Sequence, residues 1–200
     1  MNITVTLDLS TNSTGYSVWN SETKTLITYG VLKPKVPGLH KMEYPEAAMM
    51  KILDVTAKVK ELIKLHNPDV IVIEEVNRGI NRIAQKSLDA LHFFVLHALM
   101  LLNIDIRSKL IFLDSNGKQG WRGALGLRLS DEDKKANKTI RKSNKKNKLK
   151  YRPIDWKTLS QRFVNKHYGL SLDVEAKESD ADIADSIAIG HSYLHHFRSK

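Results

Sequence analysis

Four carboxylates occupy places in this sequence where they could act together on a substrate. Asp8 lies in a segment of alternating apolar and polar residues, Glu74 ends an apolar run, and Asp182 and Asp185 fall in a late helical pattern. Residues three apart on a helix project from neighbouring positions, so the last two could reach one ion or two adjacent ones. Hard divalent cations prefer oxygen ligands, and carboxylates on separate elements can surround two of them. The pattern suggests metal-assisted phosphodiester hydrolysis.

The two strand carboxylates have rivals and simpler explanations. Glu75 competes with Glu74, because neighbouring residues on a strand point to opposite faces and only one of them can face Asp8. Asp8 could also start a turn, and Glu74 could be a solvated strand end. The spacing leaves these alternatives open.

The helical acids are equally ambiguous. Glu178, Asp180, Asp182 and Asp185 are close enough in sequence that spacing does not select the last two. Ser179 followed by Asp182 also matches a capping box, in which the serine caps the helix and the acid reaches back to it. Acids in the first turn would complement the helix dipole as well.

The segments around the carboxylates predict an α/β chain that opens on three antiparallel strands. Residues 3–9 alternate with period two and place Asp8 on the polar side, as expected for a strand. Residues 15–19 and 26–32 are rich in strand-forming types, and the polar residues 20–23 join them.

Helices and buried strands follow. Residues 46–66 show a helical stripe, 70–73 form a continuous apolar strand that ends at Glu74, 80–102 form a second helix, and 110–113 form another buried strand. The order predicts a mixed five-stranded sheet, an antiparallel meander plus parallel strands, flanked by helices. A later helix begins after Asp155 and stops at Gly169, and the last one runs over about 179–197.

The positive charge is concentrated in one segment. The formal net charge is +10, and residues 134–152 hold ten basic side chains without an acid. Residues 115–152 contain several glycines and then many basic residues, and we predict that they form an inserted arm or mobile loop. Its basic part, at about 130–152, is suited to phosphate contact rather than base stacking. A solvated loop without a specific role is the alternative. The predicted DNA-binding residues of the arm are Lys134, Lys135, Lys138, Arg141, Lys142, Lys145, Lys146, Lys148, Lys150 and Arg152.

Composition limits the other possibilities. Two hundred residues with 42% hydrophobic content suit one domain over 1–200. The absence of cysteine excludes disulfides, all-cysteine zinc sites and a cysteine nucleophile, and fits a reducing cytoplasm. The longest apolar run, 93–102, is interrupted by His97 and too short to span a bilayer. We expect a soluble protein with no membrane partner and no small-molecule cofactor.

Three motifs carry a resemblance to a known family. They are Leu-Asp-Leu-Ser at 7–10 with Gly15, Val-Ile-Glu-Glu-Val at 72–76, and Ala-Asp-Ile-Ala-Asp-Ser-Ile-Ala-Ile-Gly-His at 181–191. Together, and in their order along the whole chain, they resemble the RuvC family of Holliday junction resolvases. The last motif is the most specific, whereas many nucleotide-handling folds share the first. The resemblance implies a ribonuclease H-like fold.

The resemblance also implies a site and a reaction. It makes Asp8, Glu74, Asp182 and Asp185 a catalytic tetrad that binds two Mg²⁺ ions, for which Mn²⁺ can substitute, and it selects Glu74 over Glu75 and Asp182 over Asp180. One ion would activate water for in-line attack and the other would steady the leaving 3′ oxygen, with Asp8 bridging them. The expected activity is resolution of four-way junctions by paired symmetric nicks that leave 5′-phosphate and 3′-hydroxyl ends.

Paired nicks imply two active sites and hence a homodimer. The helix at 80–102 is apolar nearly all round, which makes it a candidate for the dimer interface. A fully buried core helix of the monomer explains the same pattern equally well.

Two departures from the bacterial pattern resemble phage-encoded members. They are the long Lys/Asn insertion after Ser130, and Asn77 where a base-wedging aromatic often follows the glutamate motif. Lys118 and Lys157 fall where the family places basic residues near the scissile phosphate. Lys157 could instead be an ordinary lysine in the first turn of a helix.

Other functions share some of these features. A broader branched-DNA or ribonuclease H-type nuclease would use the same metals on another substrate. In a non-catalytic nucleic-acid-binding module the carboxylates would be caps and strand ends, and the basic arm would be the functional part. An actin-like nucleotide binder shares the first motif, but this chain is too short for its two domains.

Overall fold

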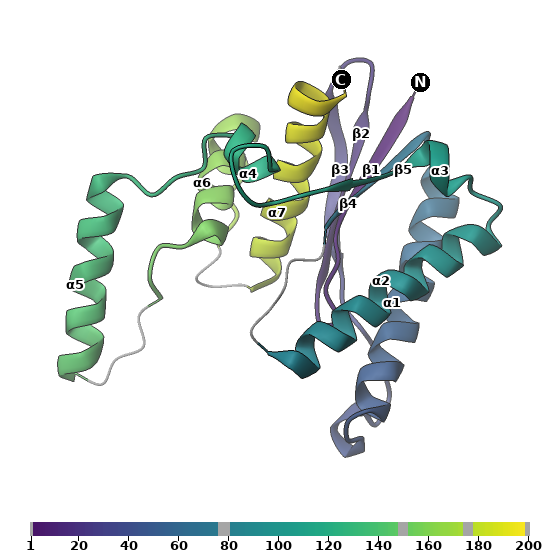
Figure 1. Ribbon diagram of the computed structural model, residues 1–200, viewed down its shortest axis with the longest axis horizontal. Helices are drawn as coiled ribbons and strands as arrows, with labels where there is room; N and C mark the ends of the chain where they lie inside the picture. The colour runs from purple at the N-terminus through teal and green to yellow at the C-terminus, as the bar shows by residue number, and fades with distance from the viewer. Residues whose placement is uncertain (1, 76–80, 148–151, 174–177, 199–200) are drawn as a thin grey trace.

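A five-stranded mixed sheet forms the centre of the computed structural model (Figure 1), which describes residues 2–75, 81–147, 152–173 and 178–198. The strand order is β3-β2-β1-β4-β5. β1 pairs antiparallel with β2, which pairs antiparallel with β3, whereas β4 runs parallel to β1 and β5 parallel to β4. This confirms the predicted meander and parallel strands. The bounds are Ile3–Asp8, Thr14–Asn20, Thr25–Leu32, Val70–Glu74 and Leu110–Leu113.

Helices cover both faces of the sheet (Figure 1). The α-helices α1 to α7 span Glu46–His66, Arg82–Leu101, Ile106–Lys109, Trp121–Ala124, Asp131–Asn147, Trp156–Tyr168 and Glu178–Ser192. Short turns lie at Leu39–Lys41 and, as a π-helix, at Tyr193–Phe197. One core packs β1 and β4 against α1 and α2, and a second lies between the sheet and helices α6 and α7.

The polar side of β1 is packed against helix α7 and shielded from solvent. Thr4 and Thr6 are fully buried. The Thr6 hydroxyl donates to the backbone carbonyl of Ser186 at 2.7 Å, and the Ser17 hydroxyl on β2 donates to the same carbonyl at 3.0 Å. Hydroxyls therefore satisfy a helix carbonyl inside the core, where an unpaired one would be unfavourable. These bonds fix α7 against the end of β1 that carries Asp8.

Gly15 allows this helix to approach the sheet. It lies opposite Asp8 in the register of β1 and β2. A Cβ atom at Gly15 would fall 1.9 Å from the backbone oxygen of Asp182. Only a residue without a side chain fits there, and the close approach brings α7 next to Asp8.

Helices α6 and α2 begin at side-chain caps. Asp155 caps α6 by accepting from the Thr158 N–H at 3.1 Å, and Gly169 ends it in the left-handed conformation with φ of 64°, as predicted. The Asn81 side chain caps α2.

Helix α2 is not the fully buried core helix that was one reading of its sequence. Leu91, Val95 and Leu99 are buried in the core, but 70% of Phe93 and 62% of Leu101 remain exposed. The apolar residues therefore lie on two sides of the helix. One side packs on α1 and the sheet, and the other is exposed to solvent. A role for the other side in a dimer stays a prediction.

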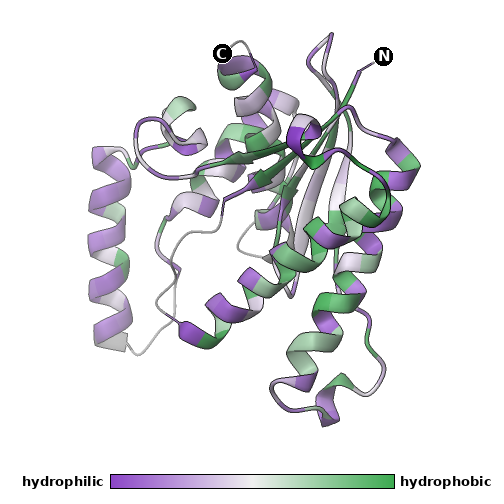
Figure 2. Ribbon diagram, turned by 45° about the vertical axis from the view of Figure 1, so that its right-hand side comes forward, coloured by the Kyte–Doolittle hydropathy of each residue, from purple (hydrophilic) through white to green (hydrophobic). Residues whose placement is uncertain are grey.

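The segment 115–152, predicted to be an inserted arm or mobile loop, contains α4 and the 17-residue helix α5, so much of its described part is regular helix and not loop. An inserted arm with its basic part at about 130–152 stays a prediction. A capping box starts α5: the Asp133 N–H donates to the Ser130 hydroxyl and the Ser130 N–H to the Asp133 carboxylate. Asn137 exchanges two hydrogen bonds with the backbone of Ile154, at 2.7 and 2.8 Å. Figure 2 shows that α5 is hydrophilic along most of its length, which is why composition alone suggested disorder.

Among the residues that the structure describes, no helix is both long and apolar enough to cross a membrane.

We expect the substitution Gly15→Ala to lower the free energy of unfolding by about 1 to 3 kcal/mol, because the added methyl group would push against the backbone of α7. Urea denaturation measures this change. Gly30→Ala on the neighbouring strand is the matched control, since its methyl group would meet only the outer ring atoms of Tyr16. Equal effects of the two substitutions would argue against a close helix–sheet approach at Gly15.

Candidate active site

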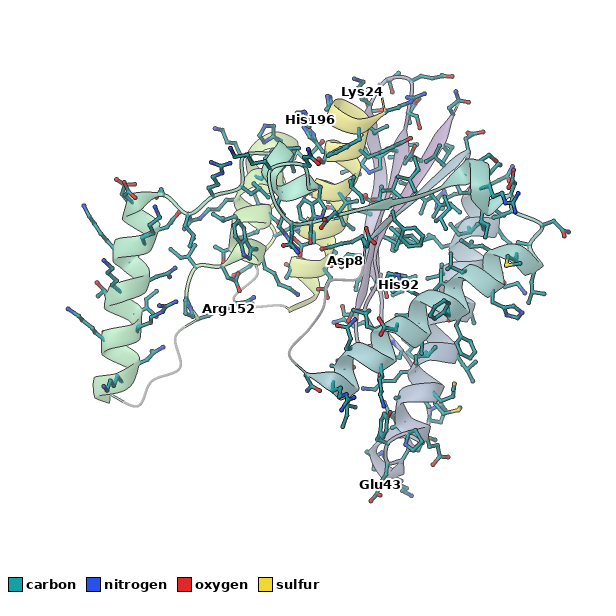
Figure 3. All side chains as sticks on the ribbon, viewed as in Figure 1. Asp8, Lys24, Glu43, His92, Arg152 and His196 are labelled. Atoms are coloured by element: carbon teal, nitrogen blue, oxygen red, sulfur yellow. The ribbon has the colours of Figure 1, made fainter. Side chains whose placement is uncertain are left out.

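The four predicted carboxylates line one hollow of about 300 Å³. Leu7 of β1 pairs with Ile73 of β4 in parallel register. The next residues, Asp8 and Glu74, therefore lie at the carboxyl ends of two neighbouring strands. Asp182 and Asp185 project into the hollow from α7. Figure 3 shows Asp8 where the strands end between α7 and α2.

Two cations partly balance these charges. The Lys157 Nζ lies 2.9 Å from the Asp182 Oδ1. One guanidinium nitrogen of Arg122 lies 3.4 Å from Glu74 and 3.8 Å from Asp185. The guanidinium also stands 4.5 Å from the centre of the Trp121 ring, which holds it against the site.

Burial and mutual repulsion alter the titration of the acids. Burial, followed by the charges of Glu74, Asp185 and Asp182, raises the pKa of Asp8 well above its ordinary value. Burial likewise raises the pKa of Glu74, although Arg122 opposes the shift. The pKa of Asp185 rises from 3.8 to about 6, mainly through burial and against the effect of Arg122. The cluster therefore favours bound protons or added cations.

The donor types fit a hard divalent cation. Every carboxylate oxygen in the hollow is a ligand of the kind that Mg²⁺ prefers. The buried Oδ1 of Asp185 accepts no hydrogen bond from any described residue, so it is available as a ligand. In the described part of the chain, however, no three acidic or imidazole groups are arranged so that they could hold an ion together. Binding would thus require side-chain movement, including release of the Arg122 and Lys157 contacts.

The rival carboxylates lie elsewhere or at the margin. Asp180 accepts a hydrogen bond from the Asp173 N–H at 3.0 Å and does not line the hollow. Glu75 is exposed at the rim and also lines a neighbouring apolar hollow with Phe93 and Phe112. The capping role considered for Ser179, and the side chain of Glu178, lie outside the described side chains.

The basic residues predicted to bind DNA fall into separate places. Lys157 lines the carboxylate hollow, whereas Lys118 lines a different hollow beside it. Arg152 pairs with Asp155 at 2.9 Å and borders a third hollow that also includes Lys157 and Asp182. Helix α5 exposes Lys134, Lys135, Lys138, Arg141, Lys142 and Lys145, while Lys148, Lys150 and the side chain of Lys146 lie outside the description, as does Asn77.

Sequence reasoning missed two side chains of the site. Arg122 follows Trp121 in a short segment that begins at Gly120 and ends at Gly123, and no spacing in the sequence links it to the carboxylates. His92 of α2 also lines the hollow, stacks on Phe112, and has its pKa lowered to about 4, mainly by burial. His92 is one of two histidines, with His97, in the otherwise apolar stretch 91–101 of α2, and this was the available signal.

The fold matches that of known resolvases. Two structures of Thermus thermophilus RuvC align with this chain, each with a TM-score of 0.59. The first, in complex with a Holliday junction substrate, is 13% identical, and the alignment covers 100% of this chain and 96% of that one. The second is 16% identical, and the alignment covers 98% of this chain and 96% of that one. No protein-family model and no curated protein sequence matches the chain. The likeness confirms the predicted RuvC-type, ribonuclease H-like architecture.

The raised pKa of Asp185 predicts a dependence of stability on pH. A carboxyl whose pKa is higher in the folded than in the unfolded state stabilises the fold below pH 4, and this contribution is lost as the pH rises through about 6. In EDTA, Asp185→Asn should therefore be more stable than the wild type at pH 8, on the order of 2 kcal/mol, and nearly equal to it at pH 4.

Urea denaturation at the two pH values measures the difference. Glu22→Gln, in an exposed turn, serves as the control and should change stability little at either pH. Equal destabilisation by Asp185→Asn at both pH values would contradict the assignment of a buried carboxylate with a raised pKa.

Proposed function

We propose that this chain is a structure-selective endodeoxyribonuclease that cuts four-way DNA junctions. The observation that carries the proposal is the convergence of Asp8, Glu74, Asp182 and Asp185 in one hollow on a RuvC-type fold. One of the two Thermus structures with this fold is a complex with a Holliday junction substrate, and that supports the choice of substrate. The expected products carry 5′-phosphate and 3′-hydroxyl ends.

The carboxylates are suited to hold divalent cations, two Mg²⁺ or Mn²⁺ ions in this proposal. Bound there, such ions would supply Lewis-acid activation of a water molecule and stabilisation of the leaving oxygen. Asp8 is the best candidate for a shared ligand, because the charges of all three other carboxylates act on it.

Lys157 and Arg122 have roles that this arrangement suggests. The Lys157 amine reaches into the hollow from α6 and is held by Asp182 at 2.9 Å. Once cations balance the carboxylates, the amine would be free to contact the phosphate being cut. Arg122 would similarly turn from Glu74 toward the substrate backbone. Both groups would then stabilise negative charge that develops on the phosphate.

A solely structural role for the four acids explains the site less well. Caps and solvated strand ends gain from exposure to water or from backbone donors. Here Asp182 and Asp185 are buried, and burial followed by repulsion from the neighbouring acids raises the pKa of Asp8. Such crowding is typical of sites whose charges serve binding or chemistry. The ribonuclease H-type or broader branched-DNA activity uses the same site and differs only in substrate.

We also propose that α5 supplies affinity for the phosphate backbone and that the active protein is a homodimer. Six basic side chains of α5 are exposed, and Asn137 and Asp133 attach the helix to Ile154 and Arg162. A helix fixed in this way can present charge to DNA without reading its sequence. Two symmetric nicks call for two active sites related by a two-fold axis.

Asp8→Asn should abolish Mg²⁺-dependent cleavage of a labelled four-way junction while leaving junction binding intact, because it removes a charge from the metal ligands without changing side-chain shape. Paired symmetric nicks by the wild type would support the proposal. Comparison with forks, flaps and RNA–DNA hybrids distinguishes a resolvase from a broader nuclease. Normal cleavage by Asp8→Asn would contradict the assignment of Asp8 as a catalytic metal ligand.

Replacing Lys138, Arg141 and Lys142 with glutamine should weaken binding to junction and duplex alike. The slope of log K against log salt should fall by up to about 0.9 for each phosphate that the variant no longer neutralises. The matched control neutralises Lys35, Lys41 and Lys64, three exposed lysines far from α5 in sequence. An unchanged slope in the α5 variant, or equal changes in both, would refute the role of this helix.

A further inference from the structure

A second hollow of about 280 Å³ lies directly beside the carboxylate hollow. Its lining includes Gly117, Lys118, Arg122, Gly123, Arg128 and Trp156. Arg122 lines both hollows, so the two are adjacent at its side chain. A ligand in the second hollow would therefore lie next to the candidate cleavage site.

The wall of this second hollow is a tightly folded loop. A Cβ atom at Gly123 would fall 2.2 Å from the backbone oxygen of Gly117, and one at Gly120 would fall 2.3 Å from that of Asn116. The Trp121 N–H donates to the Asp114 carbonyl at 2.8 Å. Backbone packed this closely around glycines holds the hollow in shape before any ligand arrives.

Positive charge is available in the second hollow. Lys118 and Arg128 are exposed. Within the described ranges, neither side chain has a carboxylate within 4 Å, unlike Arg122, which faces Glu74 and Asp185. Exposed cations that converge on a hollow without acidic partners favour an anionic ligand.

Trp156 adds a flat aromatic surface. The chain has three tryptophans, of which Trp19 and Trp121 are fully buried and Trp156 is 49% exposed. The next residue, Lys157, reaches Asp182 in the carboxylate hollow. The start of α6 thus presents an aromatic ring to one hollow and an amine to the other.

We propose that the second hollow binds one unpaired nucleotide of the DNA substrate, with its base on Trp156 and its phosphate near Lys118 and Arg128. This inference rests on the proposed nuclease function and specifies the substrate: a strand with an unstacked base flanking the phosphate to be cut. Base stacking on aromatic side chains combined with basic groups is how proteins hold single strands.

Size and chemistry favour this ligand over others. Pockets for drug-sized ligands hold about 300 to 1,000 Å³, so this hollow suits one nucleotide rather than a larger molecule. Phosphate alone would need only the cations and would leave the Trp156 ring exposed. A base inside a duplex is already stacked on its neighbours and cannot present its face to Trp156.

Tryptophan fluorescence tests the stacking directly. Measurements in EDTA exclude cleavage, and the probe is a short oligothymidylate compared with an abasic strand of equal length. The oligothymidylate should quench the emission of the wild type and not that of Trp156→Phe, because the other two tryptophans are buried. The abasic strand should quench neither protein.

Affinities from fluorescence anisotropy provide the second measurement. Trp156→Ala should raise the Kd for oligothymidylate roughly 10-fold and leave the Kd for the abasic strand unchanged, while Trp156→Phe should retain most of the affinity. Lys118→Ala combined with Arg128→Ala should weaken both strands alike. Tyr44→Ala, which removes another exposed aromatic ring, is the control and should change neither.

Equal affinity for the two strands in the wild type, or equal losses on both in Trp156→Ala, would overturn the proposal and leave a phosphate site only. The outcome is separable from that of the proposed function. A protein that shows base-dependent quenching but never nicks junctions refutes the nuclease, whereas a nuclease without base-dependent quenching refutes the nucleotide site.

Discussion

Four carboxylates forced into one buried hollow are the constraint on which this structure depends. Burial raises the pKa values of Asp8, Glu74 and Asp185, and repulsion from neighbouring acids adds to the shift for Asp8 and Asp185. The protein tolerates the four carboxylates because Lys157 and Arg122 supply two positive charges from α6 and α4. Two cations do not balance four carboxylates, and the remaining negative charge favours bound protons or, in the proposed function, divalent metal ions.

The fold can be understood as the set of contacts that keeps these acids together. Parallel pairing of β1 and β4 brings Asp8 and Glu74 together at the carboxyl ends of these strands. Gly15 and the hydroxyl of Thr6 then hold α7 against the same end of the sheet, so that Asp182 and Asp185 complete the hollow. The residues of the Gly15 and Thr6 contacts are also buried inside the fold, and site geometry and stability are therefore linked.

The elements with strong periodicity could be predicted from the sequence. The helix at Glu46–His66, the strand at Leu110–Leu113 and the Asp155 cap were all predicted correctly, since each depends on local patterns. Helix α5 was missed because its stability comes from the Ser130 and Asp133 cap and from Asn137, which docks on a residue 17 positions away. Composition reports neither interaction.

The site likewise contains some residues that local sequence patterns predict and others that only long-range contacts define. The carboxylates could be named from motifs on recognisable elements, but selection of Asp182 over Asp180 needed the resemblance to RuvC. Arg122 and the nucleotide-sized hollow arise from loop packing between glycines, which leaves no periodic signal. Long-range contacts of irregular segments are thus the part of this molecule that its sequence did not reveal.

Metal binding by the crowded carboxylates can be tested by comparing the free energy of unfolding in EDTA with that in saturating Mn²⁺. If they bind metal, Mn²⁺ at about 100 times its Kd should stabilise the wild type by roughly 2.7 kcal/mol. The same addition should stabilise Asp8→Asn much less. Stability that is unaffected by Mn²⁺, or that rises equally in both proteins, would show that the four acids do not bind metal together.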